Sequence, residues 1–156
     1  MKNLRPAIAA VFMAAMMLAA ALIKPFEGKS NVAYQDSVGI WTICRGHTLG
    51  VYEGMTATDA ECDEFFQQDL TKAFNAVSRH VTVDLPAPRL AALASFEFNV
   101  GEENFARSSV VRKINAGDTV GGCNALLQWD HAGGRELAGL KRRREAERQL
   151  CLKGAV

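Results

Sequence analysis

Two carboxylic acids and a hydroxyl lie close together in a short segment near the start of the chain. Eight residues separate Glu27 from Asp36, and five separate Asp36 from Thr42. Hydrolysis of a glycosidic bond needs a protonated carboxyl group at the leaving oxygen and a second, ionised carboxylate that acts on the sugar directly or through water. A nearby hydroxyl can hold that water. The segment therefore has the residue types for glycoside hydrolysis, although such a spacing also arises from a surface acid followed by a turn acid.

The residues around these three side chains form a recognisable pattern. Residues 26–48 read FEGKSNVAYQDSVGIWTICRGHT. This stretch resembles the catalytic hairpin of the phage-type lysozymes (glycoside hydrolase family 24), because the Glu, Asp and Thr at these spacings are followed by Gly-His-Thr. Further matches are FNVG at residues 98–101, Trp129, and GLKRR at residues 139–143. The resemblance covers residues 25–152 and is strongest to the signal-anchor-release endolysins of lambdoid phages.

The resemblance implies an enzyme and assigns roles to the three residues. The implied reaction is hydrolysis of the β-1,4 bond between N-acetylmuramic acid and N-acetylglucosamine in peptidoglycan glycan strands, with inversion and without a cofactor or metal. Glu27 would be the general acid, Asp36 the ionised partner, and Thr42 the residue that positions the water. In an inverting enzyme the two carboxyl groups are ~6.5–9.5 Å apart.

Residues that bind the substrate or tune the acid also follow from the resemblance. Family members have an arginine on the C-terminal helix that contacts the catalytic glutamate. Matching from Trp129 and Leu140 places Arg142 there, with Arg143 as the fallback. The run KRRR at residues 141–144 is otherwise typical of a solvated helix face.

Four further residues have alternative interpretations. Phe98 and Asn99 match positions that line the sugar cleft, and Asn99 is suited to an N-acetyl group, but Phe98 is better explained as a core residue. Trp129 fits a cleft wall or the core equally well. His47 titrates near neutral pH in its unperturbed state, yet we interpret it as a structural bridge between the hairpin and the helical lobe.

Two other functions remain open at this point. A lytic transglycosylase on a related fold would need Glu27 but neither Asp36 nor Thr42, and its product would carry a 1,6-anhydro end instead of a reducing end. A membrane-tethered, disulfide-linked module that binds the cell wall without turnover would need none of the three.

Size and charge limit the class of protein. The chain has 156 residues and a net charge of +1, which suits one domain with its own core and indicates no nucleic-acid partner. The positive charge is concentrated at the start, because residues 1–24 carry Lys2, Arg5 and Lys24 but no acid. The remaining residues carry 15 basic and 17 acidic side chains, a net charge of −2.

An uninterrupted apolar run of 17 residues, eight of them alanine, covers residues 7–23. A membrane-spanning helix needs ~20 residues, and the apolar part of a signal peptide usually has ~7–15. Basic residues before the run favour a cytoplasmic N-terminus and an exported body. We therefore predict an inner-membrane anchor in residues 1–24 and a periplasmic catalytic domain in residues 25–156, although removal as a signal peptide after the alanines at 19–21 remains possible. The resemblance implies that a pinholin or holin triggers release, and that the enzyme is a monomer.

The four cysteines all follow this apolar run. An even number in an exported domain indicates two disulfides, and proximity favours Cys44–Cys62 and Cys123–Cys151 among the three possible pairings. Four buried thiols are the alternative. No Cys-x-x-Cys pair is present, so a zinc site is not expected.

Periodicity predicts an α+β fold, mostly helical, with a small β-hairpin lobe beside a helical lobe and an apolar helix in front; the resemblance makes this a lysozyme-like fold. The predicted elements are a helix over 2–23, a hairpin within 32–48, a helix over 57–79 after a capping box at 56–59, a helix from Pro88 to Gly101, a short helix from Ser108 or Ser109 to before Gly117, a helix from Asp118 or Thr119 to Trp129, a break at 133–134, and a helix over 137–152.

Overall fold

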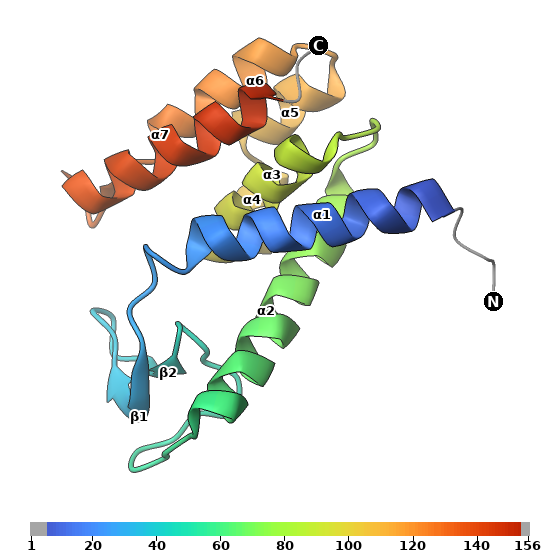
Figure 1. The fold of residues 1–156 in the computed structure, drawn as a ribbon. Coiled ribbons are helices and arrows are strands. Elements are labelled where there is room, and N and C mark those ends of the chain that lie inside the picture. Colours follow the sequence, from blue (N-terminus) through green and yellow to red (C-terminus); the bar gives the residue numbers. More distant parts are fainter. Residues whose placement is uncertain (1–5, 154–156) are drawn as a thin grey trace.

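The computed structural model describes residues 6–153, so Lys2 and Arg5 lie outside the described part. Its elements form a β-hairpin lobe and a larger helical lobe (Figure 1), and the predicted mostly helical α+β class is confirmed. The elements are α1 (Pro6–Ile23), β1 (Ser30–Gln35), β2 (Trp41–Cys44), α2 (Asp59–His80), α3 (Ala87–Val100), α4 (Glu102–Ala106), α5 (Ser109–Asn115), α6 (Thr119–Ala125), the 3₁₀ helix η1 (Leu126–Gln128), β3 (His131–Ala132), β4 (Arg135–Glu136) and α7 (Ala138–Lys153).

The hairpin lobe is a two-stranded antiparallel sheet in which Tyr34 lies opposite Thr42. The chain beyond the hairpin returns to β1, because Ala57 N–H donates to the Asn31 carbonyl at 2.9 Å. Two strands alone are marginally stable in water. The predicted disulfide between Cys44 and Cys62 is present and ties β2 to the first turn of α2.

Helix α2 connects the two lobes (Figure 1). Its capping box is formed by Thr58 and Glu61, two residues later than the predicted start of the box at Thr56. Thr58 Oγ1 accepts from Glu61 N–H at 3.1 Å, and Glu61 Oε2 accepts from Thr58 N–H at 2.7 Å. Thr56 is bridged to Val32, so the chain is still extended at that point and the helix begins later.

The helical lobe is built around α3, which packs against α1, α2 and α7. Small side chains on α3 allow these helices to approach it closely, and alanines at positions 91, 92 and 94 are fully buried. The second predicted disulfide, Cys123–Cys151, joins α6 to α7. Gly101 ends α3 with a φ of 84°, a value that glycine adopts without strain.

Helix α1 lies across the helical lobe and is part of its core. Ala15, Ala19 and Ile23 are fully buried, and their spacing of four places them on one face of the helix. The opposite face is apolar and open to solvent, with Met13 62% and Met17 71% exposed. Among residues 6–153, no helix has both the length and the hydropathy required to cross a membrane.

Some elements differ from the sequence prediction. The helix expected to reach Trp129 ends at Ala125 and continues as η1. The predicted break at Gly133 and Gly134 is the turn of a short hairpin, β3–β4. Both glycines have positive φ, 58° and 77°, as a two-residue type I′ turn requires. The short helix α4 was not expected.

Candidate active site

Glu27 is positioned by the end of α1. Its backbone N–H donates to the Ile23 carbonyl at 3.1 Å, and the Phe26 N–H donates to the same oxygen at 2.9 Å. The chain therefore makes one more turn after the helix before Glu27 faces the helical lobe. The side chain of Glu27 is 22% exposed, so one part of the carboxylate contacts protein while another part remains accessible.

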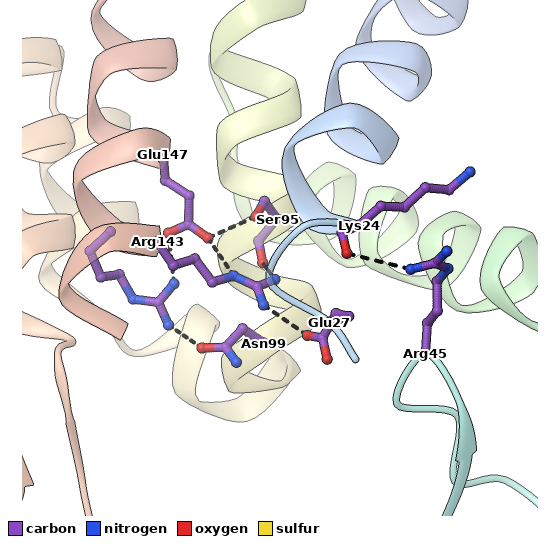
Figure 2. A network of polar contacts seen from close by, with 8 residues as sticks. Lys24, Glu27, Arg45, Ser95, Asn99, Arg143 and Glu147 are labelled. Atoms are coloured by element: carbon purple, nitrogen blue, oxygen red, sulfur yellow. Dashed lines mark hydrogen bonds and ion pairs between the residues drawn. The ribbon is translucent and has the colours of Figure 1, made fainter. Parts of the chain in front are cut away.

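Arg143, on α7, binds the Glu27 carboxylate. Arg143 Nη1 lies 2.8 Å from Glu27 Oε1, and Arg143 Nη2 donates to the Ser95 carbonyl at 3.2 Å. Figure 2 shows the guanidinium between Glu27 and α3. The arginine assigned to this contact from the sequence was Arg142, which is exposed, so that assignment was wrong and the fallback position makes the contact.

The geometry of α7 explains which arginine faces the acid. Residues three or four apart share one face of a helix, and Arg143, Glu147 and Cys151 are spaced by four. Cys151 is joined by its disulfide to α6 and fully buried, which fixes this face toward the core. Arg142 then points away from that face.

Glu147 completes a buried network behind the acid (Figure 2). Its Oε1 accepts from Ser95 Oγ at 2.7 Å and from Arg143 Nε at 3.2 Å. Its Oε2 accepts from Arg144 Nη1 at 2.7 Å. Glu147 is fully buried and pairs with both buried arginines; together with Glu27 it offsets their two positive charges, and it holds Arg143 in place.

Arg144 extends the network toward the open side of the site. Burial lowers the pKa of its guanidinium, and the Glu147 carboxylate opposes this shift. Arg144 also donates to the Trp129 carbonyl at 2.9 Å and to Asn99 Oδ1. The second bond orients the side-chain amide of Asn99. Asn99 is exposed and lines the same hollow as Glu27.

One hollow is lined by Glu27 itself, and a smaller one lies beside its neighbour Gly46. Gly46 lines the smaller one, and a Cβ at this position would lie 3.3 Å from Glu27 Oε2. Its φ of 86° and this close approach both favour glycine. The larger hollow, about 420 Å³, is lined by Pro25, Phe26, Glu27, Asn99, Leu137, Gly139, Leu140, Arg142 and Arg143. The smaller, about 200 Å³, is lined by Gly46, Thr48, Asp69, Lys72, Glu97, Phe98 and Gly101.

Asp36 lies in the turn between β1 and β2. Its Oδ1 accepts from the backbone N–H groups of Val38 and Ile40, both at 2.9 Å. The turn is closed by Asp36 N–H donating to the Ile40 carbonyl at 2.9 Å. Both of these side-chain hydrogen bonds use Oδ1, so Oδ2 can accept from a water or a sugar hydroxyl.

Thr42 is buried on β2. Its hydroxyl donates to the Ile40 carbonyl at 3.0 Å, and this orients the remaining lone pairs of Oγ1 as acceptors. Because Ile40 also pairs with Asp36, the two predicted site residues are fixed by the same turn.

His47 connects the hairpin segment to α2. Its Nδ1 lies 2.8 Å from Asp69 Oδ2, and its ring stacks on Phe65 with centroids 4.2 Å apart. The imidazole is buried. These contacts connect His47 to α2, as the predicted structural bridge requires. In the described residues, the imidazole makes no hydrogen bond to Glu27 or Asp36.

The aromatic candidates divide between cleft and core. Phe98 is half-buried, lines the smaller hollow and contacts Phe66 with ring centroids 5.7 Å apart. Trp129 packs edge-on against Phe96 at 5.4 Å and lines neither hollow, which favours its interpretation as a core residue. Within the described residues, no group of three or more His, Cys, Asp or Glu could hold a metal ion.

No role in the site was predicted for Ser95, Glu147 or Gly46. The spacing of four between Arg143 and Glu147 is a detectable helical ion-pair signal. The role of Ser95 depends on α3 and α7 packing side by side, and the role of Gly46 depends on the fold of the hairpin over Glu27, so neither has a local signal.

Comparisons with known proteins agree on a family. The family model for phage lysozyme matches residues 24–147. A protein of Enterobacteria phage PA-2 named SAR-endolysin is 43% identical over 129 residues, covering 82% of this chain and 78% of the relative. Another SAR-endolysin, from Bacteriophage PS34, is 38% identical over 154 residues, covering 94% of this chain and 92% of the relative.

Two solved structures of one related protein differ in their similarity to this fold. The crystal structure of the active form of the P1 phage endolysin Lyz is 30% identical and has a TM-score of 0.80, with 96% of this chain and 95% of that chain covered. The secreted inactive form of Lyz is 28% identical and has a TM-score of 0.61, with 92% and 96% covered.

Proposed function

Because the chain belongs to the phage lysozyme family, we propose that it is an endolysin that hydrolyses the β-1,4 bond between N-acetylmuramic acid and N-acetylglucosamine in peptidoglycan, with Glu27, Asp36 and Thr42 as its catalytic residues. The observation that carries this proposal is the Glu27 carboxylate at the meeting point of the lobes. Arg143 holds Oε1, and Oε2 faces Gly46 and the open side.

Glu27 acts as the general acid. A proton on Oε2 is the one that can reach a bound sugar, because Oε1 is engaged by the guanidinium. The proton is transferred to the glycosidic oxygen as its bond to the anomeric carbon breaks, and the sugar leaves with a free hydroxyl. Glu27 becomes a carboxylate, which the charge of Arg143 stabilises.

Asp36 acts as the base, and Thr42 positions the water. The water attacks the anomeric carbon from the face opposite the leaving group, with Asp36 Oδ2 accepting its proton. Thr42 Oγ1 accepts the second water hydrogen bond through its free lone pairs. Attack from the opposite face inverts the anomeric configuration, which requires room for the water between the two carboxyl groups.

Lysis of permeabilised cells, followed by turbidity, tests the proposal. General acid catalysis typically contributes ~10²–10⁴-fold, so we expect a loss of that size for Glu27→Gln and a clear loss for Asp36→Asn. Products with a reducing end and an inverted anomer support the mechanism. A 1,6-anhydro product would instead identify a lytic transglycosylase, and binding without clearing by the unmodified protein would identify a wall-binding module.

We further propose that residues 7–23 tether the exported protein to the inner membrane before lysis. These residues carry no charge, but α1 lacks the length and hydropathy of a stable membrane span, and 17 residues of helix reach only ~26 Å of the ~30 Å hydrocarbon core. Alanine contributes little apolar area, so the segment is held weakly and can leave. The buried face of α1 on α3 and the similarity to the active form of Lyz support the described conformation as the released form.

The tethered form is inactive in this proposal, because Glu27 is hydrogen-bonded to the last turn of α1. When α1 is in the bilayer, it cannot pack on α3, and Glu27 cannot meet Arg143. The body is periplasmic, where its disulfides form, and the N-terminus is cytoplasmic. Release follows collapse of the membrane potential by a pinholin or holin, and the released enzyme acts as a monomer.

Exposed alanines of α1 allow the release step to be tested without disturbing its packing. Ala10, Ala14 and Ala21 are exposed, so their replacement by leucine raises the apolar content and spares the face on α3. We expect the triple leucine variant to remain in the membrane fraction and to delay lysis, while triple serine at the same positions is released early. Normal fractionation and timing of the leucine variant would contradict the tether.

A further inference from the structure

A buried acid that the mechanism does not use lies at the end of α3. Glu97 is 8% exposed and lines the smaller hollow beside Glu27. Two bases whose charges act on Glu97 are engaged elsewhere, since Arg79 Nε and His80 Nε2 lie 2.8 and 2.9 Å from Glu102 Oε1. In the described part of the chain, the Glu97 carboxyl takes part in no ion pair or side-chain hydrogen bond, so it is available to a group bound in the hollow that it lines.

The surroundings of Glu97 determine its protonation. Burial raises its pKa to about 7, and the Glu102 carboxylate on α4 adds to this shift, whereas Arg79 and His80 on α2 oppose it. The other charged groups that line the hollow are Asp69, which is bound by His47, and Lys72. Glu97 is consequently mostly protonated below neutral pH, where it can present an O–H donor to the hollow.

The hollow is connected to Glu27 through a shared neighbour, Gly46. Gly46 lines it and also faces Glu27 Oε2, so a sugar bound at Glu27 has its neighbouring substituents within reach of the hollow. Phe98 contributes a half-buried ring to the lining of the same hollow. A donor beside an aromatic surface fits a small group that has both a carbonyl oxygen and a methyl group, and the N-acetyl group is such a substituent.

We propose that Glu97 is a specificity-determining residue that recognises an N-acetyl group of the substrate: its protonated carboxyl donates a hydrogen bond to the acyl carbonyl oxygen, and Phe98 packs against the methyl group. This inference rests on the proposed hydrolysis of peptidoglycan and adds a contact to the same cleft. Ionisation of Glu97 removes the donor and places a negative charge against the carbonyl oxygen, so binding weakens as the pH rises through about 7.

Binding can be separated from catalysis by working in a Glu27→Gln background. The probe is tetra-N-acetylchitotetraose carrying ¹³C at its acetyl carbonyls. At pH 6 we expect one carbonyl resonance to shift on binding, and Glu97→Met, which is similar in size but cannot donate, to lose that shift and about tenfold in affinity, as for one hydrogen bond of ~1.4 kcal/mol. Glu97→Gln retains both, because its amide N–H donates.

The pH profile gives a second readout that a purely structural role would not change. The Kd of the Glu27→Gln parent should rise between pH 6 and 8.5, whereas that of Glu97→Gln should stay flat. An unchanged carbonyl shift with Glu97→Met, or a parental pH dependence in Glu97→Gln, would overturn the inference and leave the proposed function standing. Failure of the unmodified protein to cleave peptidoglycan would overturn both.

Discussion

The two carboxylates proposed for catalysis are held in opposite ways. Glu27 is fixed by residues distant in sequence, through Arg143 and the network of Ser95, Glu147 and Arg144. Asp36 is fixed by its own turn, through backbone N–H groups two and four residues later. The proposed acid is therefore a product of the whole helical lobe, whereas the proposed base is a product of five consecutive residues, 36–40.

This difference matches the chemistry required of each group. A general acid must give up its proton at the right moment, so its surroundings must be preorganised for the charge that remains. A base that acts through water needs an accessible, ionised oxygen, which a half-exposed turn supplies. Substitutions that disturb the helical network should consequently damage both fold and activity, while those in the hairpin turn should damage activity alone.

The largest effect is expected from removing the charge of Glu147, at the centre of the buried network. Glu147→Gln keeps the shape but leaves Arg143 and Arg144 with reduced compensation, and breaking a buried ion pair costs ~3–5 kcal/mol. We expect a loss of this size in urea unfolding. Glu145→Gln is the matched control on the same helix, where a partly exposed pair with Arg148 contributes under ~1 kcal/mol. Equal losses of unfolding free energy in the two variants would show that the buried network stabilises the fold no more than the exposed pair does.

Glu97 is a buried acid that, unlike Glu27, forms no ion pair with any arginine that the structure describes, so its titration should make the free energy of unfolding depend on pH. The folded pKa of Glu97 is about 7 and its ordinary value is 4.5, so between these pH values the folded protein holds a proton that the unfolded chain has lost. The free energy of unfolding therefore falls as pH rises from 4.5 to 7, by up to ~3 kcal/mol from this group. Comparison with Glu97→Gln isolates the effect, and the difference between the two urea series should vary across this window. A constant difference would contradict the predicted titration.

The contact between acid and arginine can be tested at two adjacent positions. Arg143→Gln removes the group that orients Glu27, and a misplaced catalytic group can cost ~10²-fold in rate. Arg142→Gln changes the same charge on an exposed residue, and we expect its kcat/KM to stay within about threefold of the parent. Both are measured at a temperature where circular dichroism shows each variant folded. Similar losses of kcat/KM in the two variants would indicate that activity depends on the net positive charge of α7 and not on the contact between Arg143 and Glu27.

The smallest effect on stability is expected at the hairpin. Asp36→Asn retains Oδ1 as an acceptor for the two backbone N–H groups, so the turn persists and the free energy of unfolding should change by no more than ~0.5 kcal/mol. Hydrolysis should nevertheless fall sharply, because an amide cannot take the proton of water. A loss of stability comparable to that of Glu147→Gln would show that the base is also held by the wider fold.

The same contrast explains what the sequence could predict. The disulfide pairs, the caps at Ser108 and Gly101, and the Asp36 turn depend on local signals or short separations, and they were predictable. The choice between Arg142 and Arg143 depends on the rotation of α7 about its axis. That rotation is set by packing on α3 and by the disulfide to α6, information that a run of four basic residues does not contain. Glu97 carries no local signal, because its burial arises only when the lobes meet.

Helix α1 has a practical consequence for producing the protein. Removing an apolar N-terminal segment is a common route to better yield, and here it would keep Glu27, Asp36 and Thr42 in the shortened polypeptide. Yet Ala15, Ala19 and Ile23 are fully buried in the core where α1 packs on α3, and the Ile23 carbonyl accepts a hydrogen bond from the backbone N–H of Glu27. A truncated enzyme would therefore expose the alanine-rich side of α3 and lose the support of its acid. The segment should instead be retained and made more polar at its outward positions.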